Sequence, residues 1–434
     1  MDLVTVVLIA IGLLIFLLMM SVPLPYCFGG ALMFMGLFGN VSVKSLFVWS
    51  FGQLVNTTLL ASPLFILAGT LMGGSGIAKA LLDFVDIFIA RVRGGLGVVS
   101  VVTCAVIGAI SGSGFTGIAA TGPIMIPRMV EQGYPRGFAT ALVTCSSILG
   151  LLIPPSVVMI MYGWVTETSI LACFLSTVIP GILVTILFSV INVIWAKKFN
   201  LVMESEESVK QKRREIVPRF TNAFPALLMP VIILGGIYGG IFTPTEAAAV
   251  AAIYSIPVGF WVYKGLKMGS FYELLKESAT SVGSIMTMIM FCLMLSQTLV
   301  LLKVPQMVVE LLMGLTTNKF YLLLLINIVL FIAGMIVNDI TGIILLGPLL
   351  LPLVLELGLS PVHFGAIMGV NLSMGGVTPP YASILYLGMR IGKCEFSEIL
   401  YPTMVLLVLG YIPVVLLTTY WAPLSVWLPS LLGY

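Results

Sequence analysis

Long apolar runs dominate the chain and are separated by short polar segments. A helix needs about 20 residues to cross the hydrocarbon core of a bilayer, so runs of about that length predict membrane-spanning helices. Seven runs meet this requirement: 3–20, 52–71, 170–195, 224–242, 247–263, 281–302 and 399–420. A shorter run at 26–38 is predicted to be another. The pattern predicts an all-α polytopic membrane protein.

Two further apolar stretches are interrupted by Gly, Ser, Asn and Pro where a membrane helix should continue. The first is a predicted hairpin at 95–130 followed by a broken helix at 138–164, and the second is a hairpin at 320–355 followed by a broken helix at 364–389. Proline pairs break the helices because they cannot continue the hydrogen-bond ladder. Non-helical backbone at membrane depth is tolerated only when it is buried in protein or lines a wet cavity. The tips and breaks are therefore candidate functional elements.

These two stretches match each other at a constant offset of 225 residues. Thr116-Gly117-Ile118 recurs as Thr341-Gly342-Ile343, and Pro154-Pro155 recurs as Pro379-Pro380. Without a gap, 8 of the 18 positions from 116 to 133 are identical to their counterparts. The matches fall on Gly, Pro, Thr and Glu, so they indicate an internal duplication rather than chance similarity between apolar segments.

Charge predicts the orientation of the two copies. The segment 197–219 carries seven Lys or Arg against four Glu, and an excess of Lys and Arg is typical of cytoplasmic loops. Counting spans away from this loop places both ends of the first hairpin in the cytoplasm and both ends of the second outside. The hairpins are thus predicted to be re-entrant, and the duplication to be inverted.

Composition excludes the main soluble classes. Hydrophobic residues make up 60% of the chain and charged residues 9%, against about 25% charged in soluble domains; the mean hydropathy is +1.17. A net charge of +3 gives no argument for nucleic acid, and the single histidine excludes H-E-x-x-H zinc sites and Ser-His-Asp triads. No P-loop motif is present, and the N-terminal run lacks the basic region of a signal peptide, which favours a retained span.

Ionisable residues outside the interrupted stretches have simpler interpretations. Glu246 ends a Thr-Pro-Thr-Glu sequence and is predicted to complete a capping box at the start of a span. Asp83 and Asp86 lie in 77–91, which is predicted to be an amphipathic segment at the membrane interface. His363 is expected in a loop near the outer face.

The breaks and tips suit a particular chemistry. They free backbone carbonyl oxygens next to hydroxyl and carboxylate side chains, and hard cations such as Na⁺ take oxygen ligands. Inverted repeats with broken helices place ion and substrate sites at the midplane, and helix N-termini favour anions. Asp339 is a functional candidate because it lies inside the membrane, and it could equally cap the second half-helix. Glycine-mediated helix packing is the alternative for both hairpins.

Several motifs together resemble a known family. Pro63-Leu64-Phe65-Ile66-Leu67-Ala68-Gly69, Gly94-Gly95-Leu96-Gly97, Ser111-Gly112-Ser113, Leu149-Gly150-Leu151-Leu152-Ile153-Pro154-Pro155-Ser156 and Thr243-Pro244-Thr245-Glu246-Ala247-Ala248 occur in order. This series resembles the large membrane subunit of TRAP transporters, the tripartite ATP-independent periplasmic carriers. The tip departs from the commonest family pattern, Ser-Ser-x-Ala-Thr, because Ser113 is followed by Gly114-Phe115-Thr116-Gly117.

The resemblance implies a sodium-coupled, elevator-type carrier in the bacterial inner membrane that takes up an organic-acid anion. The anion could be a C4-dicarboxylate, a sialic or other sugar acid, or a keto acid. The resemblance also implies a small, Q-type membrane subunit and a periplasmic substrate-binding protein. A self-sufficient sodium/anion symporter is the alternative. An intramembrane enzyme is a second alternative, although no second acid lies beside Asp339.

This hypothesis assigns ligands and domains. The first sodium site would comprise Ser111, Gly112, Ser113, Gly150 and Pro154. The second would comprise Asn338, Asp339, Thr341, Gly342, Gly375 and Thr378. The anion would meet Gly114, Thr116, Pro155, Ser156 and Pro380. The domains would be scaffold spans and an interfacial helix (1–90), the first repeat core (91–196), a cytoplasmic loop (197–220), further scaffold spans (221–303), the second repeat core (304–398) and a C-terminal span (399–434).

Overall fold

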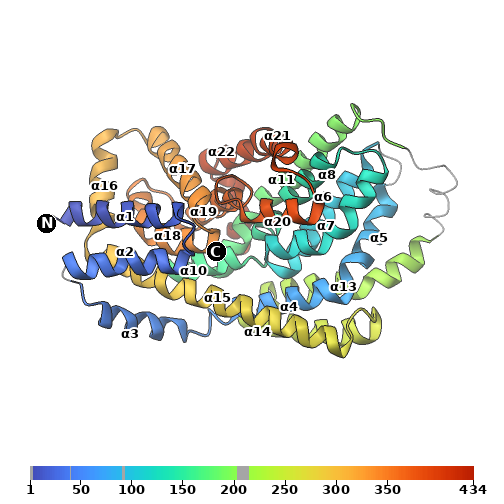
Figure 1. Ribbon diagram of the computed structural model, residues 1–434, viewed down its shortest axis with the longest axis horizontal. Helices are drawn as coiled ribbons and strands as arrows, with labels where there is room; N and C mark the ends of the chain where they lie inside the picture. Colours follow the sequence, from blue (N-terminus) through green and yellow to red (C-terminus); the bar gives the residue numbers. More distant parts are fainter. Residues whose placement is uncertain (1–2, 40, 90–92, 203–214) are drawn as a thin grey trace.

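The computed structural model describes residues 3–39, 41–89, 93–202 and 215–434, and within these ranges the chain is helical without strands. Eight helices in this part are long and apolar enough to cross a membrane, or nine if one bent pair is counted as a span. Figure 1 shows an elongated molecule in which the long helix α15 (Met268–Leu301) runs along the long axis. The expected multi-pass helical architecture is confirmed.

The N-terminal region differs from the predicted spans. Its helices are α1 (Leu3–Met19), α2 (Leu24–Phe38), α3 (Val43–Leu54), α4 (Ala61–Ser75) and α5 (Ile77–Ile89). The predicted span 52–71 is wrong, because α3 ends at Leu54 and a turn precedes α4. In that turn Asn56 Oδ1 accepts a hydrogen bond from the Thr58 N–H at 2.9 Å, an Asx arrangement that competes with helix.

Helix α5 packs closely against other helices. It meets α4 at a bend of 70° and packs against α13 (Ile216–Tyr238) and α6 (Gly95–Ser111). Asp86 on this helix is only 2% exposed. Asp86 is therefore buried within the protein, and the interfacial position of 77–91 stays a prediction.

The remaining scaffold helices lie between the two repeats in sequence. They are α13, α14 (Pro244–Pro257) with its extension η1 (Val258–Val262), and α15; α16 (Val304–Leu315) follows at the start of the predicted second repeat core. Helix α15 begins 13 residues before the predicted start at 281 and packs against α4. The predicted capping box at α14 is confirmed, because Glu246 Oε2 accepts from the Thr243 N–H at 2.7 Å and Thr243 Oγ1 accepts from the Glu246 N–H at 3.3 Å.

The helix boundaries repeat with the sequence offset. The first copy contains α6, α7 (Gly114–Glu131), α8 (Arg136–Ser147), α9 (Leu149–Leu152), α10 (Val157–Val165) and α11 (Ile170–Ala196). The second contains α17 (Lys319–Ile336), α18 (Asp339–Glu356), α19 (Pro361–Gly375), α20 (Ser383–Gly392), α21 (Phe396–Leu406), η2 (Leu407–Tyr411), α22 (Ile412–Tyr420) and α23 (Pro423–Leu431). Ends or starts of matching helices, such as Ser111 and Ile336 or Gly114 and Asp339, lie 225 positions apart.

The two copies interlock through their broken helices. Helix α10 of the first copy packs against α18 and α19 of the second, and α20 of the second packs against α7 and α8 of the first. Gly388 and Gly392 of α20 lie directly against Thr144 and Thr140 of α8, so missing side chains allow this close approach. Figure 1 shows α6 and α7 toward one end of the long axis and α17 and α18 toward the other. Re-entry of the hairpins into a membrane stays a prediction.

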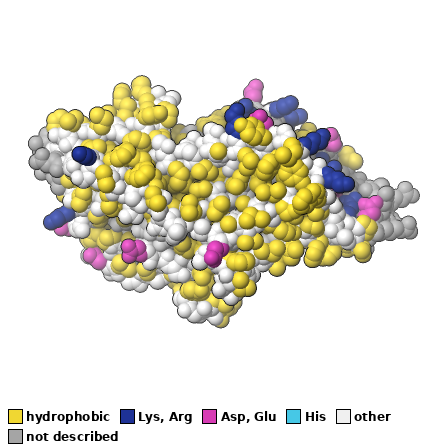
Figure 2. Space-filling view, turned by 90° about the horizontal axis from the view of Figure 1, so that it is seen from below, with side chains coloured by type: hydrophobic (Ala, Val, Ile, Leu, Met, Phe, Trp, Pro, Cys, Tyr) yellow, Lys and Arg dark blue, Asp and Glu magenta, His cyan; other side chains and the backbone are white. Residues whose placement is uncertain are grey.

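The composition of the surface is as expected for a protein surrounded by lipid. Figure 2 shows a face that is largely hydrophobic, with most of the Lys and Arg side chains in view gathered toward one end. Much of the charge that assigned the loop 197–220 to the cytoplasm lies in 203–214, outside the described residues. The expectation that His363 lies in a loop is wrong, because it lies in the first turn of α19 and is 4% exposed.

Candidate functional site

Both hairpin tips contribute to the wall of one pocket. The pocket has a volume of about 980 Å³ and is lined by Phe115 from the first tip, Asn338 from the second tip and Tyr381 from the second break. The opposite wall is formed by the α1–α2 connection, from Ser21 to Tyr26, and by one face of α15. Packing of the two copies thus brings positions more than 200 residues apart in the sequence to one hollow.

The first tip is a compact cluster of neutral oxygens. Gly112 ends α6 with φ +62°, and a Cβ at this position would lie 2.5 Å from the Pro155 carbonyl oxygen. A Cβ at Gly150 would lie 2.9 Å from the Ser113 carbonyl oxygen. Ser111 Oγ donates to that same oxygen at 3.4 Å. The residues predicted for the first sodium site therefore lie together, with Pro154 buried in the same break.

The second tip contains the only carboxylate at either tip. Asn338 caps α18, and its Oδ1 accepts from the Ile340 N–H at 2.9 Å. Asp339 Oδ1 accepts from the same N–H at 3.0 Å. Thr341, in the same first turn of α18, is fully buried, and its Oγ1 has no hydrogen-bond partner among the described residues. Buried hydroxyls almost always have a partner, so Thr341 is a position where a ligand oxygen or cation would be stabilising.

The second break is tied to its hairpin. The Tyr381 N–H donates to the Met335 carbonyl oxygen at 3.1 Å, and Gly375 packs directly against the backbone of Gly334. Thr378 Oγ1 donates to the Met374 carbonyl oxygen at 2.8 Å. Hairpin and break therefore form one unit around the predicted second site.

Gly342, also predicted for the second site, has a packing role. A Cβ there would lie 2.9 Å from a Leu372 methyl group, so the glycine lets α18 approach α19. Its place in the sequence repeat reflects this close contact.

The predicted substrate residues do not line the pocket of about 980 Å³. Ser156 is buried, donates to the Leu151 carbonyl oxygen at 2.5 Å and accepts from the Met159 N–H at 3.4 Å. Thr116 lies against Gly69 of α4, and Gly114 lies against Ile384 of α20. Pro155 meets Gly112 as described, and the carbonyl oxygen of exposed Pro380 accepts from Tyr386 Oη at 3.1 Å.

The sequence analysis missed several residues that line this pocket. Phe115 is 40% exposed beside the first tip. The pocket face of α15 carries four hydroxyl side chains: Thr280, Ser281, Ser284 and Thr287. Their spacing of three to four residues placed them on one helix face and was a detectable signal. Nothing in the sequence distinguished Phe115 from other aromatic residues in apolar runs.

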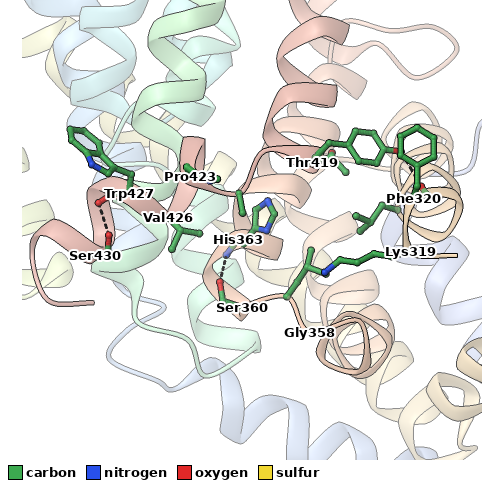
Figure 3. Close-up of a pocket in the computed structure, with 14 residues that line it drawn as sticks. Lys319, Phe320, Gly358, Ser360, His363, Thr419, Pro423, Val426, Trp427 and Ser430 are labelled. Carbon is green, nitrogen blue, oxygen red and sulfur yellow. Dashed lines mark hydrogen bonds between the residues drawn. The ribbon is translucent and has the colours of Figure 1, made fainter. Parts of the chain in front are cut away.

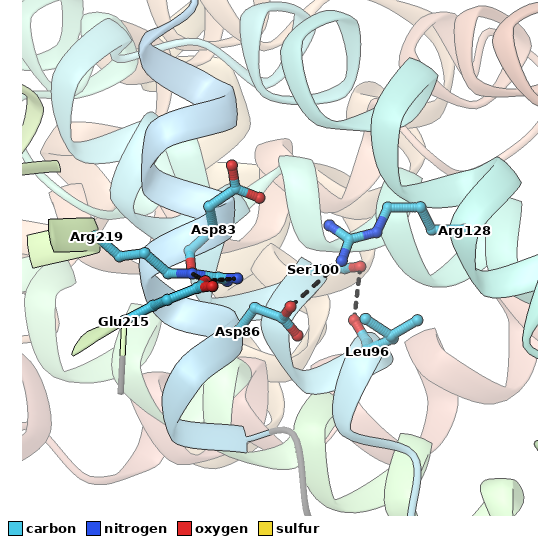
Figure 4. Close-up of polar contacts among 7 residues, drawn as sticks. All are labelled: Asp83, Asp86, Leu96, Ser100, Arg128, Glu215 and Arg219. Atoms are coloured by element: carbon cyan, nitrogen blue, oxygen red, sulfur yellow. Dashed lines mark hydrogen bonds and ion pairs between the residues drawn. The ribbon is translucent and has the colours of Figure 1, made fainter. Parts of the chain in front are cut away.

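A partly buried ion pair connects the predicted scaffold to the first repeat. Arg128 Nη2 of α7 lies 3.3 Å from Asp86 Oδ2 of α5 (Figure 4). Beside it, Arg219 pairs with Glu215 at 2.8 Å and donates to the Asp83 carbonyl oxygen at 3.1 Å. Polar contacts therefore link α5 to both α7 and α13.

Comparison with known proteins gives a consistent result. Residues 11–423 match the family model described as "Tripartite ATP-independent periplasmic transporter, DctM component". The chain is 37% identical over 402 residues to the C4-dicarboxylate TRAP transporter large permease protein DctM of Pseudomonas aeruginosa, covering 92% of each chain. It is 35% identical over 384 residues to the sialic acid TRAP transporter large permease protein SiaM of Vibrio cholerae, covering 88% of this chain and 89% of that one.

Two further matches differ in extent or in similarity. The chain is 34% identical over 385 residues to the isethionate TRAP transporter permease protein DctMQ of Oleidesulfovibrio alaskensis, with 88% of this chain matched, but it spans only 60% of that relative's length. Among solved structures, the YdaH transporter of Alcanivorax borkumensis matches with a TM-score of 0.57 and 18% identity, covering 89% of this chain and 91% of that one. This last likeness concerns the fold alone.

Proposed function

Because the chain belongs to the DctM-component family of TRAP transporters, we propose that it is the large permease subunit of a sodium-coupled carrier for an organic-acid anion. The family consists of transporter permeases and not enzymes, so the intramembrane enzyme is no longer an alternative. The observation that carries the proposal is the meeting of both hairpin tips at one pocket, beside a carboxylate and an unpartnered buried hydroxyl.

Sodium would bind most strongly at the second tip. Asn338 Oδ1, the Asp339 carboxylate and Thr341 Oγ1 are hard oxygen donors within four consecutive positions, and such donors suit a hard cation. A bound cation would offset the cost of holding a carboxylate inside the membrane and would give the Thr341 hydroxyl a partner. The first tip offers only the neutral oxygens of Ser111, Ser113 and Pro155, so it would hold its ion less tightly.

The anion would bind in the pocket between the tips and α15. Helices α7 and α18 begin at the tips, so the positive ends of their dipoles lie near the pocket. The hydroxyl row on α15 supplies further donors, and Phe115 and Tyr381 supply apolar faces. The names of these relatives specify C4-dicarboxylate, sialic acid and isethionate, which are all anions. The substrate class we propose is therefore a small organic acid.

Coupling would follow from the position of the ion. Sodium at the second tip would hold Asn338 and the start of α18 in the conformation that lines the pocket, and the ligand would then stabilise the same conformation. The two hairpins and broken helices would move together as an elevator against the scaffold helices. In this proposal the Asp86–Arg128 pair spans the boundary between the static and the moving part.

The partners follow from the family's tripartite organisation. Helices α1 and α3 expose large apolar side chains, among them Leu8, Phe16 and Phe51, and this surface would receive the small membrane subunit in the bacterial inner membrane. A periplasmic binding protein would deliver the anion to the outer face.

Reconstitution tests this proposal. The chain would be placed in proteoliposomes with a small membrane subunit of the TRAP family, a periplasmic binding protein would be added outside, and uptake of a radiolabelled organic acid would be followed under an inward sodium gradient. We expect uptake that requires all three proteins and collapses when potassium replaces sodium. Uptake that ignores sodium would contradict the coupling, and full uptake by the isolated chain would favour the self-sufficient symporter.

A further inference from the structure

A second cavity lies apart from the hairpin tips. It has a volume of about 780 Å³ and lies between the start of α17, the start of α19 and the C-terminal helix α23. Figure 3 shows Lys319 and Phe320 on one side, Trp427 and Ser430 on the other, and His363 between them. The volume is within the range of about 300–1,000 Å³ that is common for ligand pockets. It shares no lining residue with the pocket at the tips.

The first repeat shows how this space is filled elsewhere in the same molecule. The positions equivalent to Leu359, His363 and Tyr420, 225 residues earlier, are Tyr134, Phe138 and Trp195.

These aromatic side chains pack on one another in the first repeat. The ring centroids of Phe138 lie 6.1 Å from Tyr134 and 5.2 Å from both Trp195 and Phe199. Beside this cluster only a cavity of about 230 Å³ remains. The first copy therefore fills the site largely with its own side chains, whereas the second copy leaves it open.

The chemistry of the opening specifies what would fill it. Lys319 is exposed at the rim and is the one formally charged side chain among the described lining residues. Its Nζ donates to the Leu357 carbonyl oxygen at 2.8 Å, which holds the ammonium at the mouth. Phe320 and Trp427 are 52% and 55% exposed. Exposed aromatic residues with a lysine are typical of the level of lipid headgroups.

The interior of the cavity is apolar and has a fixed inner wall. Leu323, Pro423 and Val426 line it. His363 Nε2 donates to the Thr418 carbonyl oxygen at 2.8 Å, so the imidazole joins α19 to α22. The apolar interior would suit an acyl chain, and the single cation at the rim would suit a phosphate group.

We propose that this cavity binds one phospholipid, with an acyl chain in the space that aromatic rings occupy in the first repeat and the phosphate beside Lys319. The lipid would complete the packing of the second repeat against the C-terminal helix. The site is independent of the sodium and anion sites.

Filling the cavity tests the proposal. The double variant Leu359→Tyr/His363→Phe copies the first repeat, and His363→Gln is the matched control because it leaves the space open and keeps a donor for Thr418. Native mass spectrometry of the chain released from nanodiscs of phosphatidylethanolamine and phosphatidylglycerol would count bound lipids. We expect the double variant to lose one phospholipid per chain and the control to retain it. Equal lipid counts in all three proteins, or detergent alone in the wild-type cavity, would overturn the proposal.

A second measurement decides the matter if the double variant fails to fold. Phosphatidylglycerol with a photoreactive acyl chain should cross-link the wild-type protein within 319–326 or 419–430, and cross-links confined to other segments would contradict the site. Lys319→Gln should reduce the preference for phosphatidylglycerol over phosphatidylcholine roughly fivefold, as expected for one lysine at a membrane surface. An unchanged preference would remove Lys319 from the site.

Discussion

The two repeats have matching backbones and different chemistry. In the first, Gly112, Gly150 and Ser156 close the tip and the break with their own backbone and hydroxyl groups. In the second, the positions equivalent to Ser113 and Gly114 are Asn338 and Asp339. The Thr341 hydroxyl beside them is buried without a partner in the described chain. Buried polar atoms without a partner among the described residues occur in both repeats, for example at Thr103 and Thr144 in the first, but Thr341 is the one that lies at a tip.

The same asymmetry extends into the body of the second repeat. Asn327 Oδ1 accepts hydrogen bonds from Asn371 at 2.8 Å and Thr419 at 3.0 Å in the buried interior. Two of the three equivalent positions in the first repeat are apolar, Val102 and Ile194. The two copies therefore share a frame but place their buried polar side chains at different positions. From the carboxylate of Asp339 and the unpartnered hydroxyl of Thr341 at the second tip, we expect that tip to hold the more strongly bound ion.

The largest expected effect concerns the inversion of the two copies. A single cysteine replacing Lys198 should react with a membrane-impermeant maleimide only from the cytoplasm, and one replacing Thr317 only from the periplasm. The reason is that the hairpins would enter from opposite faces. Both cysteines reacting from one side would exclude the inverted arrangement.

Glycine contacts shared by both copies give the next largest effect. Gly150→Ala would place a methyl group 2.9 Å from the Ser113 carbonyl oxygen, and Gly375→Ala would collide with the backbone of Gly334. Because backbone atoms cannot move aside cheaply, each variant should lose about 1–3 kcal/mol of stability and most of its uptake. Gly314→Ala is the control, since no atom lies within 4 Å of its Cβ position. Thermal melts and uptake would be compared, and normal uptake by both alanine variants would show that the close contacts are dispensable.

Sequence patterns were sufficient to predict the helix breaks that both copies share. The Pro-Pro pairs that match at an offset of 225 identified the two breaks, because a proline pair cannot continue a helix. Other matched residues, such as Pro123 and Pro348, lie inside α7 and α18. The same local reasoning missed the turn at Asn56, since one polar residue inside an apolar run does not by itself end a helix.

The direction of each side chain could not be read from the sequence. Ser156 was expected to meet the anion, yet it caps α10, whereas the equivalent Tyr381 reaches the pocket. Which of the two points outward depends on how α10 and α20 pack against the opposite repeat. That packing follows from the three-dimensional contacts of both copies and leaves no local signal at either residue.

Thr341 and Thr116, which occupy equivalent positions in the two repeats, should differ in how their replacement changes stabilisation by sodium. Thr341→Val removes a buried hydroxyl that lacks a partner, so it should raise stability by about 1 kcal/mol in sodium-free buffer and weaken stabilisation by added sodium. Thr116→Val should leave the sodium response unchanged. Melting temperatures in sodium and choline buffers would measure both effects. A Thr341→Val protein with an undiminished sodium response would remove the hydroxyl from the ion site.

The smallest effect concerns Ser156. Replacing it with alanine removes the cap of α10 and should cost about 1 kcal/mol of stability, while the sodium and substrate dependence of uptake stay as in the wild type. A changed KM for the anion would instead support the role expected from the sequence.

Sodium dependence of uptake tests the central claim, that the second tip holds the more tightly bound ion. Asp339→Asn keeps an oxygen that can accept from the Ile340 N–H but removes the charge, and Ser111→Ala is the matched change at the first tip. In reconstituted transporter we predict that Asp339→Asn raises the half-saturating sodium concentration about tenfold or more, equivalent to about 1.4 kcal/mol, with protein yield unchanged. Ser111→Ala should shift it by less than about threefold, because neutral ligands contribute less than charged ones. A wild-type sodium curve for Asp339→Asn would contradict the account and leave this carboxylate as a helix cap.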